Sequence, residues 1–175
     1  VLRITGKYAQ AVRLAKAATR VRRVAGPAAV AYARALIAVG KVKQAEKVLE
    51  RAVAQDAKNV AARAWLGQVY LLLGKKLKVG VIAKDLYRDW DNGVLDKKRA
   101  DHTFLVGLGG LYDQNWQFAS DAFEQALKID PKLFLANLVW GDLFMRKYNV
   151  PDAERCFKDV LKFNPNHPDA WAGLA

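Results

Sequence analysis

The sequence predicts an all-helical solenoid, because the second half of the chain repeats one pattern at a constant spacing. Each copy carries a small residue deep in each of two helical patterns and then ends at a proline. Self-similarity at a short fixed period is typical of solenoids, in which each unit buries its apolar face against its neighbours. The equivalent positions are Gly107 and Gly141, Ala119 and Ala153, Phe123 and Phe157, and Pro131 and Pro165.

The first residues predict the second half of a unit rather than its start. The pattern Gly-Lys-x-x-x-Ala occurs at residues 6–11 and again at 40–45, the same distance along the chain that separates Gly107 from Gly141. Residues 1–25 therefore correspond to a second helix, and we expect the first helix of that unit to lie mostly or wholly upstream. Pro27 begins the next helix, since proline is favoured in a first turn.

The middle of the chain predicts a change of register. The unit that begins at Val60 extends to residue 99 and is longer by six than its neighbours. We place the extra residues at 91–96, because Asn92-Gly93 is typical of a turn and Asp96 is a candidate helix cap. The complete assignment is one solenoid over residues 1–175, with units at 26–59, 60–99, 100–133 and 134–167 and the start of a further unit at 168–175.

Small residues at fixed places predict how the helices cross. Two antiparallel helices approach closely only where the side chains at their contact are small. We expect glycine at the crossing in first helices, alanine in second helices, and large side chains in the space between successive pairs. These three sets are Gly67, Gly107 and Gly141; Ala45, Ala119 and Ala153; and Tyr70, Phe123, Phe144 and Phe157.

The sequence resembles the tetratricopeptide repeat in its period and at Leu66-Gly67-x-x-Tyr70, which matches the family's pattern. The resemblance implies a right-handed superhelix of antiparallel helix pairs that serves as a protein-interaction scaffold. The stretch that begins at Trp140-Gly141-Asp142-Leu143-Phe144 is similar to bacterial tetratricopeptide proteins, some of which continue into a metallopeptidase-like region. No peptidase motif lies within these 175 residues.

The residues offer little material for catalysis, and we predict no enzyme activity, no metal site and no cofactor. The histidines His102 and His167 lie outside any His-Glu-x-x-His motif, so surface or capping roles are expected for both. Cys156 stands beside the core residue Phe157 without a neighbouring base, which favours a packing role. No run of 18 apolar residues exists, so no transmembrane helix is expected.

The first helices should line the concave face of the superhelix, where their spacing predicts a largely apolar groove. Such a lining favours an amphipathic helix or a hydrophobic strand of another protein as the ligand. The alternative is that these side chains bury one another, or that a segment of the chain itself occupies the groove. The predicted groove residues are Arg34, Trp65, Gln68, Leu72, Phe104, Leu105, Leu108, Tyr112, Leu135, Leu138, Asp142, Met145 and Arg146.

Charge is distributed unevenly along the chain. Residues 1–99 carry 22 Lys and Arg against 7 Asp and Glu, whereas residues 100–175 carry 7 against 10. This asymmetry favours an acidic partner near the first half, whether nucleic acid, anionic lipid or an acidic protein surface. The alternative is a solvated face that keeps the solenoid soluble. The predicted basic face comprises Arg20, Arg22, Arg23, Lys43, Lys47, Lys75, Lys76 and Lys78.

The function predicted from the sequence is a scaffold that binds a protein, as a peptide or helix, in its concave groove. One alternative is a basic helical-repeat module that binds nucleic acid or anionic membrane through its outer face. A second is the repeat portion of a larger bacterial peptidase-like protein. Because both ends of the chain interrupt a unit, their uncapped helix faces also predict self-association.

Overall fold

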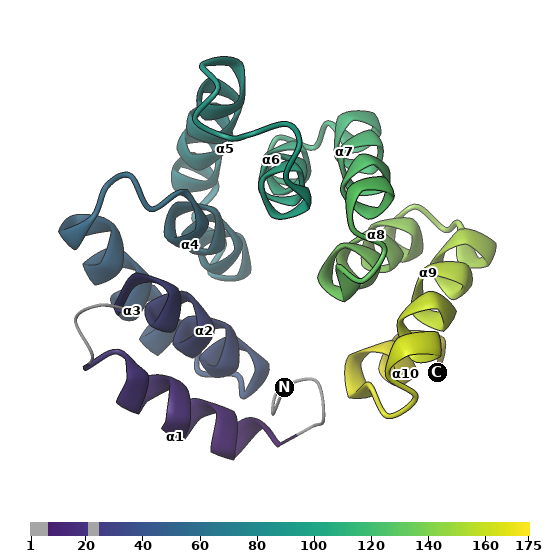
Figure 1. Cartoon of the computed structure of the whole chain (residues 1–175), viewed down its shortest axis with the longest axis horizontal. Coiled ribbons are helices and arrows are strands. Elements are labelled where there is room, and N and C mark those ends of the chain that lie inside the picture. The colour runs from purple at the N-terminus through teal and green to yellow at the C-terminus, as the bar shows by residue number, and fades with distance from the viewer. Residues whose placement is uncertain (1–6, 21–24) are drawn as a thin grey trace.

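The computed structural model describes residues 7–20 and 25–175, and it confirms the all-helical fold. Within those residues the chain forms ten helices and no strand. The helices are α1 (Tyr8–Ala18), α2 (Ala25–Ala38), α3 (Val42–Gln55), α4 (Val60–Leu72), α5 (Lys76–Asp91), α6 (Ala100–Tyr112), α7 (Trp116–Ile129), α8 (Phe134–Arg146), α9 (Val150–Phe163) and α10 (Pro168–Leu174). Antiparallel pairs of these helices stack side by side as a curved solenoid (Figure 1).

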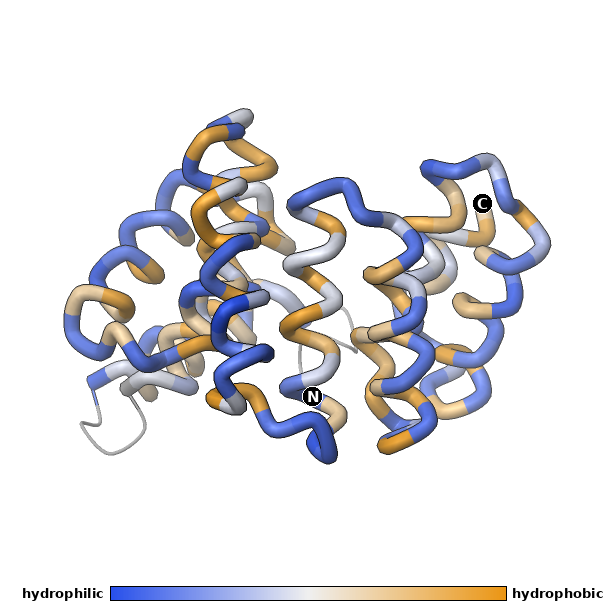
Figure 2. Tube along the Cα trace, turned by 90° about the horizontal axis from the view of Figure 1, so that it is seen from above, coloured by the Kyte–Doolittle hydropathy of each residue, from blue (hydrophilic) through white to orange (hydrophobic). Residues whose placement is uncertain are grey.

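The helices form two layers around a curved axis. The even-numbered helices α2, α4, α6 and α8 line the inside of the curve, and the odd-numbered helices α3, α5, α7 and α9 lie outside them (Figure 1). Hydrophobic and hydrophilic residues alternate along the helices, as expected when one face of each is buried (Figure 2). The curve is tight enough for its ends to meet, since the Tyr8 hydroxyl donates a hydrogen bond of 2.9 Å to the Asp169 carboxylate.

The first helices α2, α4, α6 and α8 all end in the same backbone turn. Gly40 and Gly74 adopt left-handed φ angles of 74° and 70°, and Gln114 and Tyr148 adopt 59° and 57° at the equivalent places. In each case the next amide N–H donates to the carbonyl five residues earlier, at 2.8 to 2.9 Å, which is the Schellman arrangement. The first two turns have the same spacing as the last two, whereas six extra residues lie between Gly74 and Gln114.

The extra residues lengthen α5 and form a compact turn at 92–99. Leu95 fills the turn and is only 1% exposed. The imidazole Nδ1 of His102 accepts a hydrogen bond of 2.8 Å from the Asp96 N–H, so this histidine supports the turn. The expectation that Asp96 caps the next helix is wrong, because α6 follows Arg99 as its N-cap. The Asp96 carboxylate instead accepts a backbone N–H within the turn, at 2.9 Å.

Each glycine of the two regular pairs accommodates an aromatic ring of its partner helix. A Cβ atom at Gly107 would lie 2.6 Å from the Phe123 ring, and one at Gly141 would lie 2.7 Å from the Phe157 ring. Phe123 and Phe157 are 0% and 1% exposed, which confirms that they fill the core. On its other side the Phe157 ring would also meet a Cβ at Gly173, at 2.5 Å. These rings therefore set how closely successive helices approach.

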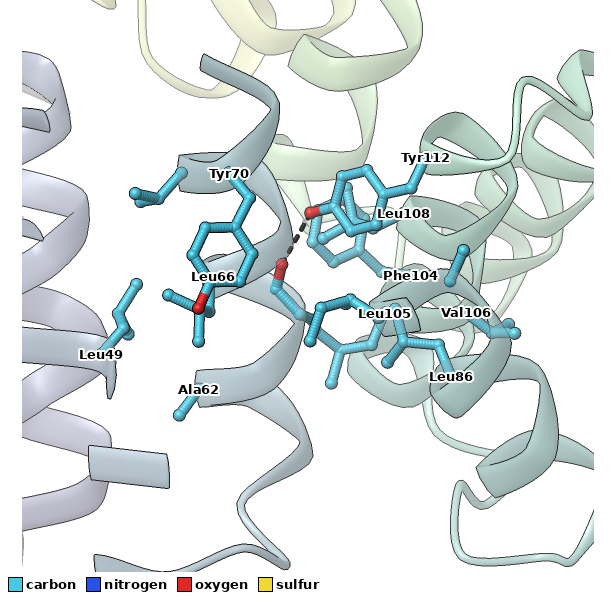
Figure 3. Packing of buried hydrophobic residues seen from close by; sticks show 14 of the residues in the cluster. Leu49, Ala62, Leu66, Tyr70, Leu86, Phe104, Leu105, Val106, Leu108 and Tyr112 are labelled. Atoms are coloured by element: carbon cyan, nitrogen blue, oxygen red, sulfur yellow. Dashed lines mark hydrogen bonds between the residues drawn. The ribbon is translucent and has the colours of Figure 1, made fainter. Parts of the chain in front are cut away.

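Gly67 of α4 packs against an aromatic ring of α6, and not against a ring of its paired helix α5. A Cβ at Gly67 would lie 2.5 Å from the ring of Tyr112 on α6. The hydroxyl of that tyrosine donates a hydrogen bond of 2.7 Å to the Ala64 carbonyl, and burial raises its pKa (Figure 3). Phe144, which was expected to fill the same kind of space, is only half-buried and stacks on Trp140 with 5.3 Å between ring centroids.

The inner layer opens between α6 and α8. Helices α2, α4 and α6 pack on one another in turn, and α8 packs on α10, whereas α6 and α8 hardly touch. The buried side chains form two clusters, and the first of them extends from α2 to α8. The second cluster joins α8, α9 and α10 through Leu138, Phe157 and Ala170. This opening creates the cavity described below.

Tyr148 adopts a left-handed backbone conformation, so its replacement by glycine should stabilise the protein. A left-handed conformation costs a non-glycine residue roughly 1–2 kcal/mol, and replacement by glycine removes this cost. Glycine also makes the unfolded chain more flexible, which offsets about 0.5–1 kcal/mol of the stabilisation. The Tyr148 side chain is 94% exposed, so little packing is lost. We expect Tyr148→Gly to raise the free energy of unfolding by about 0.5–1 kcal/mol in urea titrations. Gly74→Ala, the opposite kind of change in the equivalent turn after α4, should lower it.

Two glycine-to-alanine substitutions should have opposite effects. Gly107→Ala forces the Phe123 ring to move and should lower the free energy of unfolding by about 1–3 kcal/mol. Gly80→Ala on α5 meets no atom within 4 Å and should raise it by about 0.5–1 kcal/mol. Urea denaturation of both variants would test this, and an equal effect of the two would contradict the interlocked packing.

Candidate functional site

A cavity opens on the inner face where α4, α6 and α8 come together. Its volume is about 90 Å³, enough for several water molecules or one small apolar side chain. It exists because α8 turns away from α6 instead of closing against it. The lining residues are Trp65, Gln68, Leu71, Leu108, Leu111, Val139, Asp142, Leu143 and Arg146.

The cavity has an apolar floor and a polar rim. Leu108 and Leu143 form the floor and are 2% and 4% exposed. Leu71 lies at the mouth with 36% of its surface exposed. The rim carries the amide of Gln68 and, one helical turn apart on α8, side chains of both signs. Such a combination of apolar surface with a few polar groups is typical of binding sites.

The indole of Trp65 forms one wall and is held by a cation from the preceding pair. The Arg34 guanidinium of α2 lies 4.7 Å from the centre of the Trp65 ring. A guanidinium over an indole face is attracted by the ring's quadrupole, by about 0.5–1 kcal/mol where solvent reaches it. The contact favours this orientation of the indole before a ligand binds, which lowers the entropy cost of binding.

Asp142 sits in an electrostatically unfavourable place. Desolvation within the crowded inner face raises the pKa of its carboxyl, and the charge of Asp169 on α10 raises it further, while Arg146 lowers it. The carboxyl still reaches solvent. A donor or a cation from a ligand would relieve this penalty, because hydrogen bonding to the charged form favours it.

Comparisons with known proteins agree with this architecture. A family model described as the tetratricopeptide repeat matches residues 2–58. The thermophilic tetratricopeptide protein TTC0263 of Thermus thermophilus superposes with a TM-score of 0.64 at 17% identity, covering 95% of this chain and 88% of that one. The described chain has the fold of a tetratricopeptide repeat solenoid.

Another solved tetratricopeptide protein, YrrB, is described as having an unusual peptide-binding site. It superposes with a TM-score of 0.50 at 17% identity, covering 99% of this chain and 86% of that one. At this identity the likeness concerns the fold alone. A search among curated proteins found no match.

The tetratricopeptide superhelix brings together five of the thirteen groove residues that were predicted from the sequence. Of the remainder, Arg34 and Leu135 are half-buried, and Leu72 and Met145 are exposed outside the cavity. The residues of the predicted groove that line the cavity are Trp65, Gln68, Leu108, Asp142 and Arg146. Their role in binding stays a prediction.

Four of the predicted groove residues belong to the core instead, because neighbouring helices close over them. Phe104, Leu105, Tyr112 and Leu138 are 3%, 7%, 6% and 7% exposed and do not line the cavity. The prediction had overlooked Leu71, Leu111 and Leu143 as lining residues. A signal existed, since Leu111 follows Leu108 at the i, i+3 spacing of one helix face.

The predicted basic face lies only partly free in the tetratricopeptide fold. Arg20, Lys43, Lys47 and Lys76 are exposed. The other two described members point at carboxylates of α3: Lys75 pairs with Glu46, and Lys78 lies 3.7 Å from Glu50. Arg22 and Arg23 fall outside the described residues.

The remaining candidates for chemistry show no catalytic grouping among the residues that the structure describes. A surface or capping role was expected for His167; it is fully buried, so the surface role is wrong, and it occupies the N-cap position of α10. No cluster of three potential metal ligands occurs within residues 7–20 and 25–175. No helix in the same part of the chain is long and apolar enough to cross a membrane.

The thiol of Cys156 should report on local opening of α9. Burial raises its pKa from 9.0 to about 12, so the reactive thiolate is scarce at pH 8. We expect negligible reaction with a disulfide reagent at pH 8 and fast reaction in urea, followed by absorbance of the released chromophore. Above pH 9 only the unfolded thiol ionises readily, so the free energy of unfolding should fall as the pH rises. Rapid labelling of the native protein would contradict the burial.

Proposed function

We propose that this tetratricopeptide chain binds a peptide of another protein on its inner face, with one apolar side chain anchored in the cavity between α4, α6 and α8. Tetratricopeptide repeat proteins serve as protein-interaction scaffolds, in general without catalytic activity. The observation that supports a specific site is the apolar cavity with its polar rim, at the place where the inner layer opens.

The dimensions of the cavity favour a peptide side chain over a small-molecule ligand. Pockets for small molecules and cofactors usually enclose about 300–1,000 Å³. At about 90 Å³ this cavity holds far less than that. A peptide that runs along the inner face needs only such anchors, spaced along the groove, and gains its remaining contacts from the surface around them.

The polar residues of the rim determine which peptide residues are favoured next to the apolar side chain in the cavity. The Gln68 amide can both donate to and accept from a peptide backbone. Asp142 and Arg146 offer opposite charges one helical turn apart, so strongly acidic and strongly basic peptides each meet one repulsive group. A small apolar residue flanked by neutral or mixed-charge residues fits this arrangement best. The peptide-binding site named for YrrB makes a peptide ligand plausible on this fold.

The proposal is tested with peptides selected by display on the wild-type chain. Leu71→Glu places a carboxylate at the mouth of the cavity, where a bound apolar side chain would desolvate it. We expect the dissociation constant of a selected peptide to rise roughly 10-fold or more, measured by fluorescence anisotropy. Trp65→Ala should weaken the same peptide by a similar factor through loss of the wall.

Leu77→Glu is the matched control for this experiment. It makes the same chemical change on the outer face of α5, where the side chain is 91% exposed, and should leave the affinity unchanged. Thermal unfolding of each variant checks that the fold is kept. Selected peptides that bind the Leu71→Glu and Leu77→Glu variants equally well would refute the assignment of the cavity.

A further inference from the structure

Cations on the outer helices α7 and α9 are paired with carboxylates of their own helix, whereas most exposed cations on α3 and α5 are not. The pair Arg88–Asp85 on α5, at 2.6 Å, is the exception. On α7 and α9, lysines and arginines pair with carboxylates one turn away on the same helix. The distances are 2.8 Å for Lys128–Glu124, 2.9 Å for Arg155–Asp152 and 2.6 Å for Lys162–Asp159. These pairs leave the outer surface of the second half nearly neutral.

On α3 the two glutamates are instead drawn away from the helix's own lysines. Glu46 and Glu50 pair across the interface with Lys75 and Lys78, beside the Tyr70 ring, whose hydroxyl donates to Glu50 at 3.1 Å. The exposed cations along α3 and its neighbour α5 are consequently left without a described carboxylate partner. These cations are Lys43, Lys47 and Arg51 on α3 and Lys76 and Lys84 on α5.

Aliphatic side chains project into solvent on α5, the helix that carries two of these cations. Leu77 and Val81 are 91% and 58% exposed and lie one turn apart on α5. Lys84 continues the same stripe at helical spacing. A Cβ at Gly80, between the two aliphatic residues, would meet no atom within 4 Å. The core therefore makes no use of this stripe.

We propose that the outer face of α3 and α5 docks on an anionic lipid bilayer. Unpaired lysines close to such a surface are attracted to its negative potential, and exposed aliphatic side chains enter the interfacial layer. No helix has to span the membrane for this kind of attachment. The face thus combines the two features by which peripheral proteins bind membranes.

The arrangement fits a bilayer better than the other anionic partners. Single-stranded nucleic acids are bound by aromatic side chains that stack on bases, and the exposed aromatic residues Tyr148, Phe163 and Trp171 lie at the other end of the solenoid. A folded acidic protein would need pockets for its anchoring residues. The open grooves described outside the inner face lie between α7 and α9 and beside α10.

Sedimentation with vesicles tests the charged part of the proposal. The whole chain should partition onto vesicles of phosphatidylcholine mixed with phosphatidylserine and remain in solution with phosphatidylcholine alone. Replacing Lys43, Lys47 and Arg51 with glutamine should lower the partition coefficient on the order of 100-fold, since each cation near the surface contributes roughly a factor of five. Added salt should release the protein.

The matched control replaces Lys128, Lys158 and Lys162 with glutamine. It removes the same net charge from cations that are already paired with carboxylates. We expect it to change the partition coefficient by much less than the α3 variant does. An equal loss in the two triple variants would show a response to net charge alone and would overturn the assignment of the face.

The double variant Leu77→Ser with Val81→Ser distinguishes a bilayer from nucleic acid. We expect it to lower vesicle binding roughly 10-fold while leaving the weaker, salt-sensitive attraction to single-stranded RNA unchanged. Tighter binding to RNA than to anionic vesicles, or vesicle binding that is insensitive to this variant, would overturn the proposal. Leu71→Glu should leave vesicle binding intact, so this inference and the peptide site can fail separately.

Discussion

The close approach of glycine and aromatic rings between the two helix layers governs the structure. Where Phe123 meets Gly107 and Phe157 meets Gly141, no atom larger than hydrogen fits between the helix backbone and the ring. The distance between the layers is thereby fixed at each pair. Because each unit packs only on its neighbours, a fixed distance repeated along the chain also fixes the curvature. That curvature brings α1 to α10 and gives the protein its inner face.

The same constraint explains why the fold could be predicted from the sequence and the site could not. A glycine and a phenylalanine at a constant separation are visible in one copy of the repeat and recur in the next. The cavity depends instead on how far α8 turns from α6, which is the sum of contacts made by α7, α9 and α10. Helix α6 shows the consequence. Its apolar residues extend around the whole helix, so periodicity could not tell that Phe104 faces the core whereas Leu111 reaches the cavity.

The pairing of charged side chains likewise depends on how the helices pack. The excess of cations in the first half of the chain is evident from composition, but composition does not tell which cations remain free. Glu46 and Glu50 lie at helical spacing from Lys43 and Lys47 and could pair with them locally. In the fold they face α5, because the buried residues Ala45 and Leu49 orient α3 toward the core and carry the glutamates to the interface. Burial therefore decides the pairing, and the pairing decides which surface is basic.

The two proposed surfaces share the helix pair α4 and α5 and face opposite ways. Trp65 on α4 forms a wall of the inner cavity, and Leu77 on α5 projects from the outside. Between them, the Arg63 guanidinium of α4 pairs with the Asp89 carboxylate of α5 in a largely buried contact. Loss of either partner would leave a charge in a poorly solvated place, so this contact helps to hold the two helices together. A chain attached through α3 and α5 would consequently keep its inner face open and its cavity undistorted, and it could hold a peptide while it lies on a surface.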